Sequence, residues 1–135
     1  MMYQEVRKYT ETRFKTQWDA LTNGVVYTFL NKPLSQPKEW LRVSVVFSGG
    51  QQDSIGGAVP QKTITGTIIV QIFTEKNSGG GRSKQLADII GPIFEMRQAV
   101  QDGVQIDFRA AYLTSPPEQP DYFMENLIVP FEATK

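Results

Sequence analysis

Hydrophobic residues near the start of the chain recur with the period of a helix. Over residues 2–21 they follow one another every three or four positions, which places them on one helical face, while most charged residues fall on the others. This face carries Val6, Thr10, Phe14, Trp18 and Leu21. Asn23 and Gly24 come next, and both residue types tolerate the positive φ at which helices commonly end. We predict a helix over residues 2–21 that lies on a sheet.

The next three segments have the pattern of strands. Residues 25–30 form a short β-branched and aromatic run. Residues 40–48 alternate between apolar and polar positions, as expected when one face of a strand is buried. Residues 61–75 form the longest strand candidate, with Gly66 on the apolar face where a large side chain would otherwise sit. The opposite, threonine-rich face is predicted to be solvated or to contact another subunit. Residues 48–60, which contain four glycines and no periodic pattern, are predicted to be a long, flexible loop of a length that is usually functional or disordered.

A second helix is expected after a glycine-rich turn. Ser83 has the residue type of an N-cap for a helix over residues 84–100. The apolar face of this helix carries Leu86, Ile89, Ile90, Ile93 and Phe94. Pro92 falls inside the pattern, so we expect a kink or a break there. Asp102 and Gly103 end the helix.

Two further strands complete the predicted fold. Residues 104–113 alternate again, and residues 114–121 form a proline-stiffened connection to a last strand over residues 122–131. Pro130 predicts that the end of this strand lies at a sheet edge, since proline cannot donate to a ladder. The element order indicates a single α+β domain spanning residues 1–135. We expect a mainly antiparallel five-stranded sheet with two helices packed on one face.

Composition excludes most familiar active sites. The chain has 135 residues, no cysteine and no histidine, so disulfides, thiolate or Ser-His-Asp nucleophiles and most zinc sites are excluded. Fourteen basic residues balance fourteen acidic ones, which leaves no long-range field to gather nucleic acid and little self-repulsion between copies. No run approaches the ~20 apolar residues of a membrane span, and the N-terminus lacks a signal-peptide core. We therefore expect a cytoplasmic protein with no cofactor, no metal and no membrane partner.

Three weaker chemical patterns in the sequence could indicate a binding or catalytic site. The tract from Gly79 to Lys84 could hold an anion at a helix N-terminus, but it matches neither phosphate-loop signature. A basic and aromatic group for single-stranded nucleic acid is scattered along the chain: Trp40, Arg42, Arg82, Lys84, Arg109 and Tyr112. Five carboxylates are candidates for acid–base chemistry, but most fall in predicted turns or on polar strand faces, where surface charge is the better interpretation: Asp53, Asp102, Asp107, Asp121 and Glu125.

The ordered series of segments resembles a bacteriophage family. The series contains an N-terminal helix, an Asn31-Lys32-Pro33 turn, the strand from Trp40 to Val45 and a glycine-rich loop. It continues with the strand from Thr65 to Phe73, the Gly79–Arg82 turn, a helix with Leu86-Ala87-Asp88-Ile89-Ile90, and the closing run from Leu127 to Phe131. In this order they are similar to the tail terminator, or tail-completion, proteins of long-tailed phages, of the phage lambda U-protein type.

The resemblance implies a structural protein without catalytic residues. Such proteins form a homohexameric ring on the head-proximal end of the tail tube, stop its polymerisation and join the tail to the head. The implied partners are copies of the chain, the tail tube protein and the head–tail connector, and the implied location is the virion tail, after assembly in the host cytoplasm. The candidate assembly-interface residues are Trp40, Arg42, Gly49, Gly50, Asp53, Ile55, Thr65, Thr67, Gly80 and Arg82. Another neck or tube component, or a small anion-binding module, remains an alternative.

Overall fold

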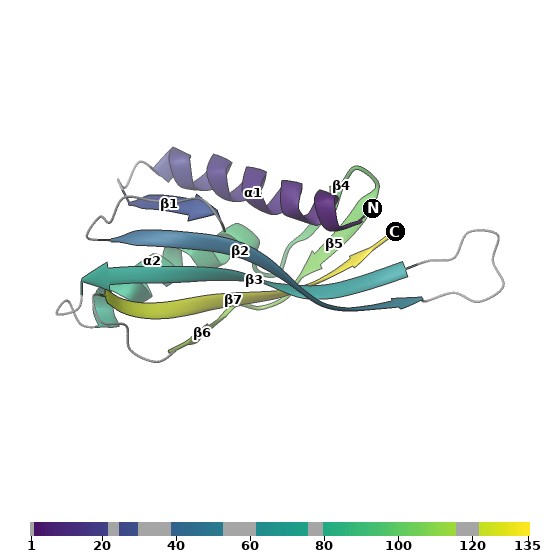
Figure 1. Ribbon diagram of the computed structural model, residues 1–135. Helices are drawn as coiled ribbons and strands as arrows, with labels where there is room; N and C mark the ends of the chain where they lie inside the picture. Colours follow the sequence, from purple (N-terminus) through teal and green to yellow (C-terminus); the bar gives the residue numbers. More distant parts are fainter. Residues whose placement is uncertain (1, 22–24, 30–38, 53–61, 76–79, 116–121) are drawn as a thin grey trace.

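The computed structural model describes residues 2–21, 25–29, 39–52, 62–75, 80–115 and 122–135 (Figure 1). Within these ranges the chain forms two helices and seven strands. In chain order they are α1 (Met2–Leu21), β1 (Val26–Phe29), β2 (Trp40–Gln52), β3 (Lys62–Glu75), α2 (Gly80–Phe94), β4 (Gln98–Gln101), β5 (Val104–Phe108), β6 (Tyr112–Thr114) and β7 (Tyr122–Thr134). The α+β class is therefore as predicted.

All seven strands belong to one curled sheet. Its order is β1-β2-β3-β7-β5-β4, and β6 also pairs with β7. β1 runs parallel to β2, whereas every other described pair is antiparallel. The sheet is thus mainly antiparallel, but the prediction of five strands was wrong. The two strands missed are β4, which was assigned to a helix, and β6, which was joined to β5.

Strict alternation along the long strands creates the core. In β3 the even residues from Ile64 to Thr74 are buried, as is Phe73 near the end of the strand, and in β7 the buried positions are the odd residues from Glu125 to Ala133. The register sets these two rows side by side on one face, which we call the inner face. Both helices contact this face and each other, since α1 contacts β2, β4, β5 and β7, and α2 contacts β3 and β7. One continuous cluster of apolar side chains results.

Helix α1 spans the predicted residues because its aromatic face is anchored at several points. Phe14 stacks on Trp18 with 5.6 Å between ring centroids, and it also stacks on Phe94 of α2 at 6.4 Å. The indole Nε1 of Trp18 donates a 2.9 Å hydrogen bond to the carbonyl oxygen of Val25, so the buried polar atom is satisfied. Leu21, which was predicted on the buried face, is exposed at the end of the helix.

Helix α2 begins earlier and ends earlier than predicted. It starts at Gly80, so Ser83 lies inside the helix and is not its N-cap. The helix ends two residues after Pro92, and Met96 then takes a positive φ of 58°, which reverses the chain into β4. The amide of Glu95 still donates to the carbonyl of Gly91 at 2.9 Å. Ile89, which was predicted to be in the core, is exposed.

Pro130 lies on an interior strand, which corrects its predicted place at an edge. It pairs with Thr67 of β3, and its carbonyl accepts a 2.9 Å hydrogen bond from the amide of Arg109 on the other side. β5 pairs with β7 from Phe131 onward, and β6 pairs with β7 up to Ile128, so Pro130 falls in the gap between them. The backbone nitrogen and the carbonyl oxygen of one residue point to the same side of a strand. The nitrogen of Pro130, which has no hydrogen to donate, therefore faces this gap.

Strand β2 continues beyond its predicted end. It passes a bulge between Phe47 and Gly49 and pairs with β3 up to Gln52, where a loop was expected to have begun at Ser48. Residues 48–52 and 62–65 therefore form a two-stranded extension, which we call the β2–β3 arm. Figure 1 shows the arm reaching to the right, past the ends of both helices.

Gly66 is required because two groups occupy the space of a side chain. A Cβ at this position would lie 2.4 Å from the carbonyl oxygen of Val46 and 2.8 Å from Cζ of Phe131. The first neighbour is backbone and cannot move aside without breaking the β2–β3 pairing. Phe131 fills the space above the glycine and meets Phe47 edge-to-face, with 5.9 Å between ring centroids.

We predict that Gly66→Ala lowers the free energy of unfolding by about 2–4 kcal/mol, because the methyl group forces the two strands apart. Urea denaturation followed by circular dichroism measures this. Gly81→Ala is the matched control, since a Cβ there meets nothing within 4 Å. We expect the control to change stability by less than about 1 kcal/mol. Equal effects of the two substitutions would contradict this explanation for Gly66.

Candidate functional site

The candidate site lies on the face of the sheet that the helices leave uncovered. This outer face is formed by the residues that alternate with the core positions along β2, β3, β6 and β7. It comprises Trp40, Arg42, Ser44, Val46, Thr65, Thr67, Ile69, Gln71, Phe73, Tyr112, Thr114, Met124, Asn126, Ile128 and Pro130. Apart from Phe73, these side chains are half-buried or exposed.

Aromatic rings and a guanidinium group form one end of the outer face. Trp40 and Phe73 are cross-strand partners, and their rings stack with 4.0 Å between centroids and 6° between planes. The guanidinium carbon of Arg42 lies 5.1 Å from the Trp40 ring centroid and 5.9 Å from that of Phe73. The stack holds a flat aromatic platform and a cation in place, which is the residue chemistry enriched at protein interfaces.

The middle of the outer face carries a row across four strands whose members on β3, β7 and β6 are apolar or aromatic. Ser44 pairs with Ile69, Ile69 pairs with Ile128, and Ile128 pairs with Tyr112. Tyr112 is 51% exposed, and Val46 in the next row is 45% exposed. No helix of the described residues covers this row. The row is therefore an apolar strip that faces solvent in the isolated chain.

The predicted interface residues separate into two groups along the strands. Trp40 and Arg42 lie at one end, whereas Gly49 and Thr65 lie in the arm and Thr67 lies beside it. Trp40 and Gly49 are nine residues apart along β2, or roughly 30 Å at ~3.3 Å per residue. The hydroxyl oxygens of Ser48 and Thr65 are 3.3 Å apart. The threonine-rich row is thus on the outer face, as its alternation predicted.

The remaining predicted residues are not part of this face or are not described. Gly50 pairs with Ile64, a core residue of the inner face, and Gly80 is the first residue of α2. Arg82 forms an ion pair with Glu39 through a 2.6 Å contact between its Nε and the carboxylate, next to Trp40 in sequence. Asp53 and Ile55 lie outside the described residues.

Glu125 is buried, which corrects its prediction as a surface carboxylate. It is 2% exposed on the inner face of β7, where it pairs with Ile72 of β3. The hydroxyl of Ser83 donates to its Oε1 at 2.5 Å, and Nζ of Lys84 donates to the same oxygen at 3.1 Å. Both partners come from the first turns of α2, where the helix dipole also favours a negative charge. Glu125 therefore fastens α2 to the sheet.

The other carboxylates are not brought together. Asp102 lies in the β4–β5 turn at a positive φ of 52° and accepts a 3.3 Å bond from Nζ of Lys8. Hydrogen bonds from Gln101, and then from Lys8, lower the pKa of Asp102 below its ordinary value. Asp107 lies on β5, and Asp53 and Asp121 fall outside the described residues. Over the described ranges, no three acidic side chains are grouped as a metal site would need.

Most of the basic residues proposed for a nucleic-acid or anion site form ion pairs with carboxylates of the same chain. Arg82 pairs with Glu39, Lys84 with Glu125, and Arg109 with Glu132 at 3.0 Å. Arg42 instead lies over the half-buried ring of Trp40. Neither of the two described helices is both long and apolar enough to cross a bilayer.

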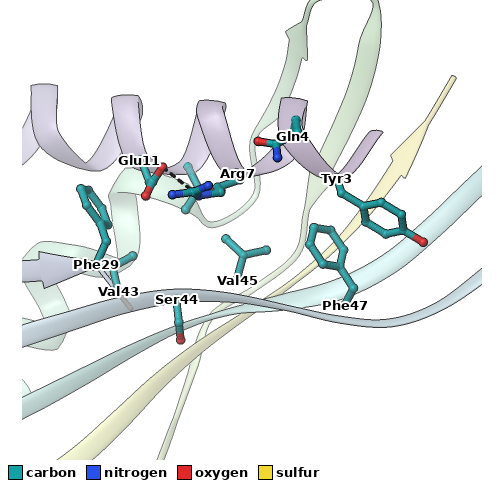
Figure 2. A pocket seen from close by; sticks show the side chains of 10 residues that line it. Tyr3, Gln4, Arg7, Glu11, Phe29, Val43, Ser44, Val45 and Phe47 are labelled. Carbon is teal, nitrogen blue, oxygen red and sulfur yellow. Dashed lines mark ion pairs between the residues drawn. The ribbon is translucent and has the colours of Figure 1, made fainter. Parts of the chain in front are cut away.

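A hollow of about 490 Å³ lies between α1 and β2, beside the point where β1 ends. Figure 2 shows Val45 and Phe47 pointing from β2 toward the helix, while Ser44 points away from it. Tyr3 meets Phe47 edge-to-face with 4.7 Å between ring centroids. Arg7 and Glu11 form an ion pair at 3.3 Å along the helix side of the hollow. Sequence reasoning missed this hollow, because it arises only when α1 is placed over the sheet.

Comparison with known proteins adds information on the fold. No protein-family model matches this sequence, and no curated protein matches it either. A solved structure whose name describes no function shares the fold with a TM-score of 0.75. The two chains are 16% identical, and the match covers 96% of this chain and 94% of the other. The arrangement of helices and strands therefore recurs over most of another protein chain.

We predict that Ser83→Ala lowers the free energy of unfolding by about 1–3 kcal/mol, because it removes a buried hydrogen bond to a charged group. Lys84→Ala should cost less, since the Lys84 side chain is 59% exposed and solvent screens its pair with Glu125. Thermal and urea unfolding of the two variants test this order. A larger loss for Lys84→Ala would show that the ion pair, and not the hydroxyl, holds α2 on the sheet.

Proposed function

We propose that this chain is a structural protein of a phage tail, a tail terminator that assembles as a ring through its outer face and arm. The observation that carries the proposal is the uncovered apolar strip of Ile69, Ile128 and Tyr112 beside the Trp40–Phe73 platform. A monomeric protein normally covers or charges such a strip, whereas a ring subunit uses it against a neighbour.

The ring would cap the head-proximal end of the tail tube. It would end tube polymerisation and present the surface that joins the tail to the head–tail connector. In this role its partners are copies of itself, the tail tube protein and the connector, and its place is the virion tail. The family resemblance implies six copies in the ring. A zero net charge assists close packing of identical subunits.

The proposal requires no catalytic residue, cofactor or metal. The absence of histidine and cysteine from the sequence removes the common acid–base and nucleophilic side chains. The buried carboxylate, Glu125, is engaged by Ser83 and Lys84 and serves to hold α2. Anion binding at the start of α2 is disfavoured as an alternative, because Arg82 and Lys84 both have carboxylate partners. Another neck or tube component remains the second candidate, since it would use the same kind of surface.

The direct test is electron microscopy of tails from the encoding phage with this gene deleted. A tail terminator predicts overlong tubes that carry no heads, because polymerisation has no stop and no joining surface. Tails of normal length that fail to join heads would favour another neck component. Tails of normal length that join heads would contradict both structural roles.

A second test uses single substitutions on the outer face. We predict that Tyr112→Asp weakens assembly roughly tenfold or more, because a charge replaces an aromatic residue that packs against a neighbour. Light scattering at several protein concentrations and complementation of the deletion measure the loss. Ile89→Asp is the matched control, since Ile89 is exposed on α2 and not on the outer face. Equal loss for both variants would count against the outer face as the interface.

A further inference from the structure

Strand β2 has a long edge that the described residues leave without a neighbouring strand. β1 pairs only with residues from Trp40 to Val43, whereas β2 continues to Gln52. Val43, Ser44, Val45 and Phe47 of this strand line the hollow between α1 and β2 (Figure 2). Alternate amides and carbonyls along this edge point outward and can bond to a further strand.

The other end of the sheet has a second such edge. β4 pairs with β5 on one side, and the described residues place no strand on its other side. Val100 on this strand is 71% exposed. Val100 lies opposite Gln105 of β5, and Gln105 pairs with Thr134 of β7. Thr134 pairs with Thr63, whose side chain is on the outer face. Val100 therefore shares its face with Val46, the exposed valine beside the edge of β2.

Neither edge carries the residues that normally keep a strand from pairing with another chain. Natural edge strands are protected by charged side chains, above all lysine, or by proline. Residues 44–52 read Ser-Val-Val-Phe-Ser-Gly-Gly-Gln-Gln, and β4 reads Gln-Ala-Val-Gln. Both are free of charge and of proline, although one residue in five of the whole chain is charged (21%). The two edges are different surfaces of one sheet, and the uncharged sequence of each is compatible with pairing to a strand of another copy.

We propose that β4 of one copy adds to the edge of β2, beside residues 44–47, in the next copy. The contact joins two different surfaces of the same chain, so repeating it generates a ring or an open helix. Main-chain hydrogen bonds supply the pairing, and Val100 lies on the outer side next to Val46 of its neighbour. The inference rests on the proposed ring and adds to the contact through the outer face a contact between two strand edges.

The absence of cysteine from the chain allows a direct test by disulfide formation. In the double variant Val46→Cys/Val100→Cys, each copy carries both halves of the contact. Oxidation should then give a ladder of covalent dimers, trimers and larger species that ends at the ring size on a non-reducing gel. The double variant Val46→Cys/Gln98→Cys tests a pairing shifted by two residues, since Gln98 lies on the same side of β4 as Val100. A short thiol-to-thiol crosslinker removes the need for ideal disulfide geometry.

The controls separate this contact from random collision. Each single-cysteine variant alone should stay monomeric on the gel, and a mixture of the two should stop at dimers. Val46→Cys/Ile89→Cys should give no ladder, because Ile89 lies on α2. As an independent measurement, Val100→Lys should move assembly to higher protein concentration in light scattering, whereas Ile89→Lys should leave it unchanged.

The outcomes distinguish the edge contact from the ring itself. Ring-shaped particles in micrographs without a ladder from either double variant would overturn the edge pairing and leave the ring in place. Dimers from Val100→Cys alone would also overturn it, since they show contact between two β4 edges. A chain that gives no ladder and no particles, alone or with tail tubes, would overturn both the edge pairing and the ring.

Discussion

The whole structure depends on the two-residue alternation of the long strands β3 and β7. It gives the sheet one face that is apolar enough to bury under both helices. Gly66 is needed on that face because Phe131 lies over it and the carbonyl of Val46 lies beside it. The same alternation sends Ile69 and Ile128 to the opposite face, where neither helix covers them. Burial on one side and exposure on the other are therefore two consequences of one pattern.

Local sequence patterns were sufficient to predict the elements whose apolar residues repeat regularly with the helix or strand period. Helix α1 and strand β3 have the predicted positions because Phe14, Trp18 and the even residues of β3 repeat regularly. The region after Pro92 was not predictable in this way. Apolar residues continue to Val100 at helical spacing, and only the reversal at Met96 and the pairing with β5 make that segment a strand. Long-range pairing overrides local propensity there.

The candidate site could be predicted only where it follows from alternation. Trp40, Arg42, Thr65 and Thr67 lie on the outer face, as their spacing indicates. The burial of Glu125 could not be foreseen, because it depends on a hydroxyl and an ammonium group from α2, about forty positions earlier in the chain. The hollow beside β2 likewise exists only because β1 is short and α1 crosses above it.

Both helices pack on the inner face, whereas no helix of the described residues covers the outer face. In the proposed ring, other subunits cover it. The most direct test is hydroxyl-radical footprinting of the outer face, followed residue by residue, in the isolated chain and in intact tails. The account predicts strong protection of Trp40 and Tyr112 in tails, with Tyr9 on α1 unchanged as the internal reference. Equal labelling of Trp40 and Tyr112 in both states would contradict it.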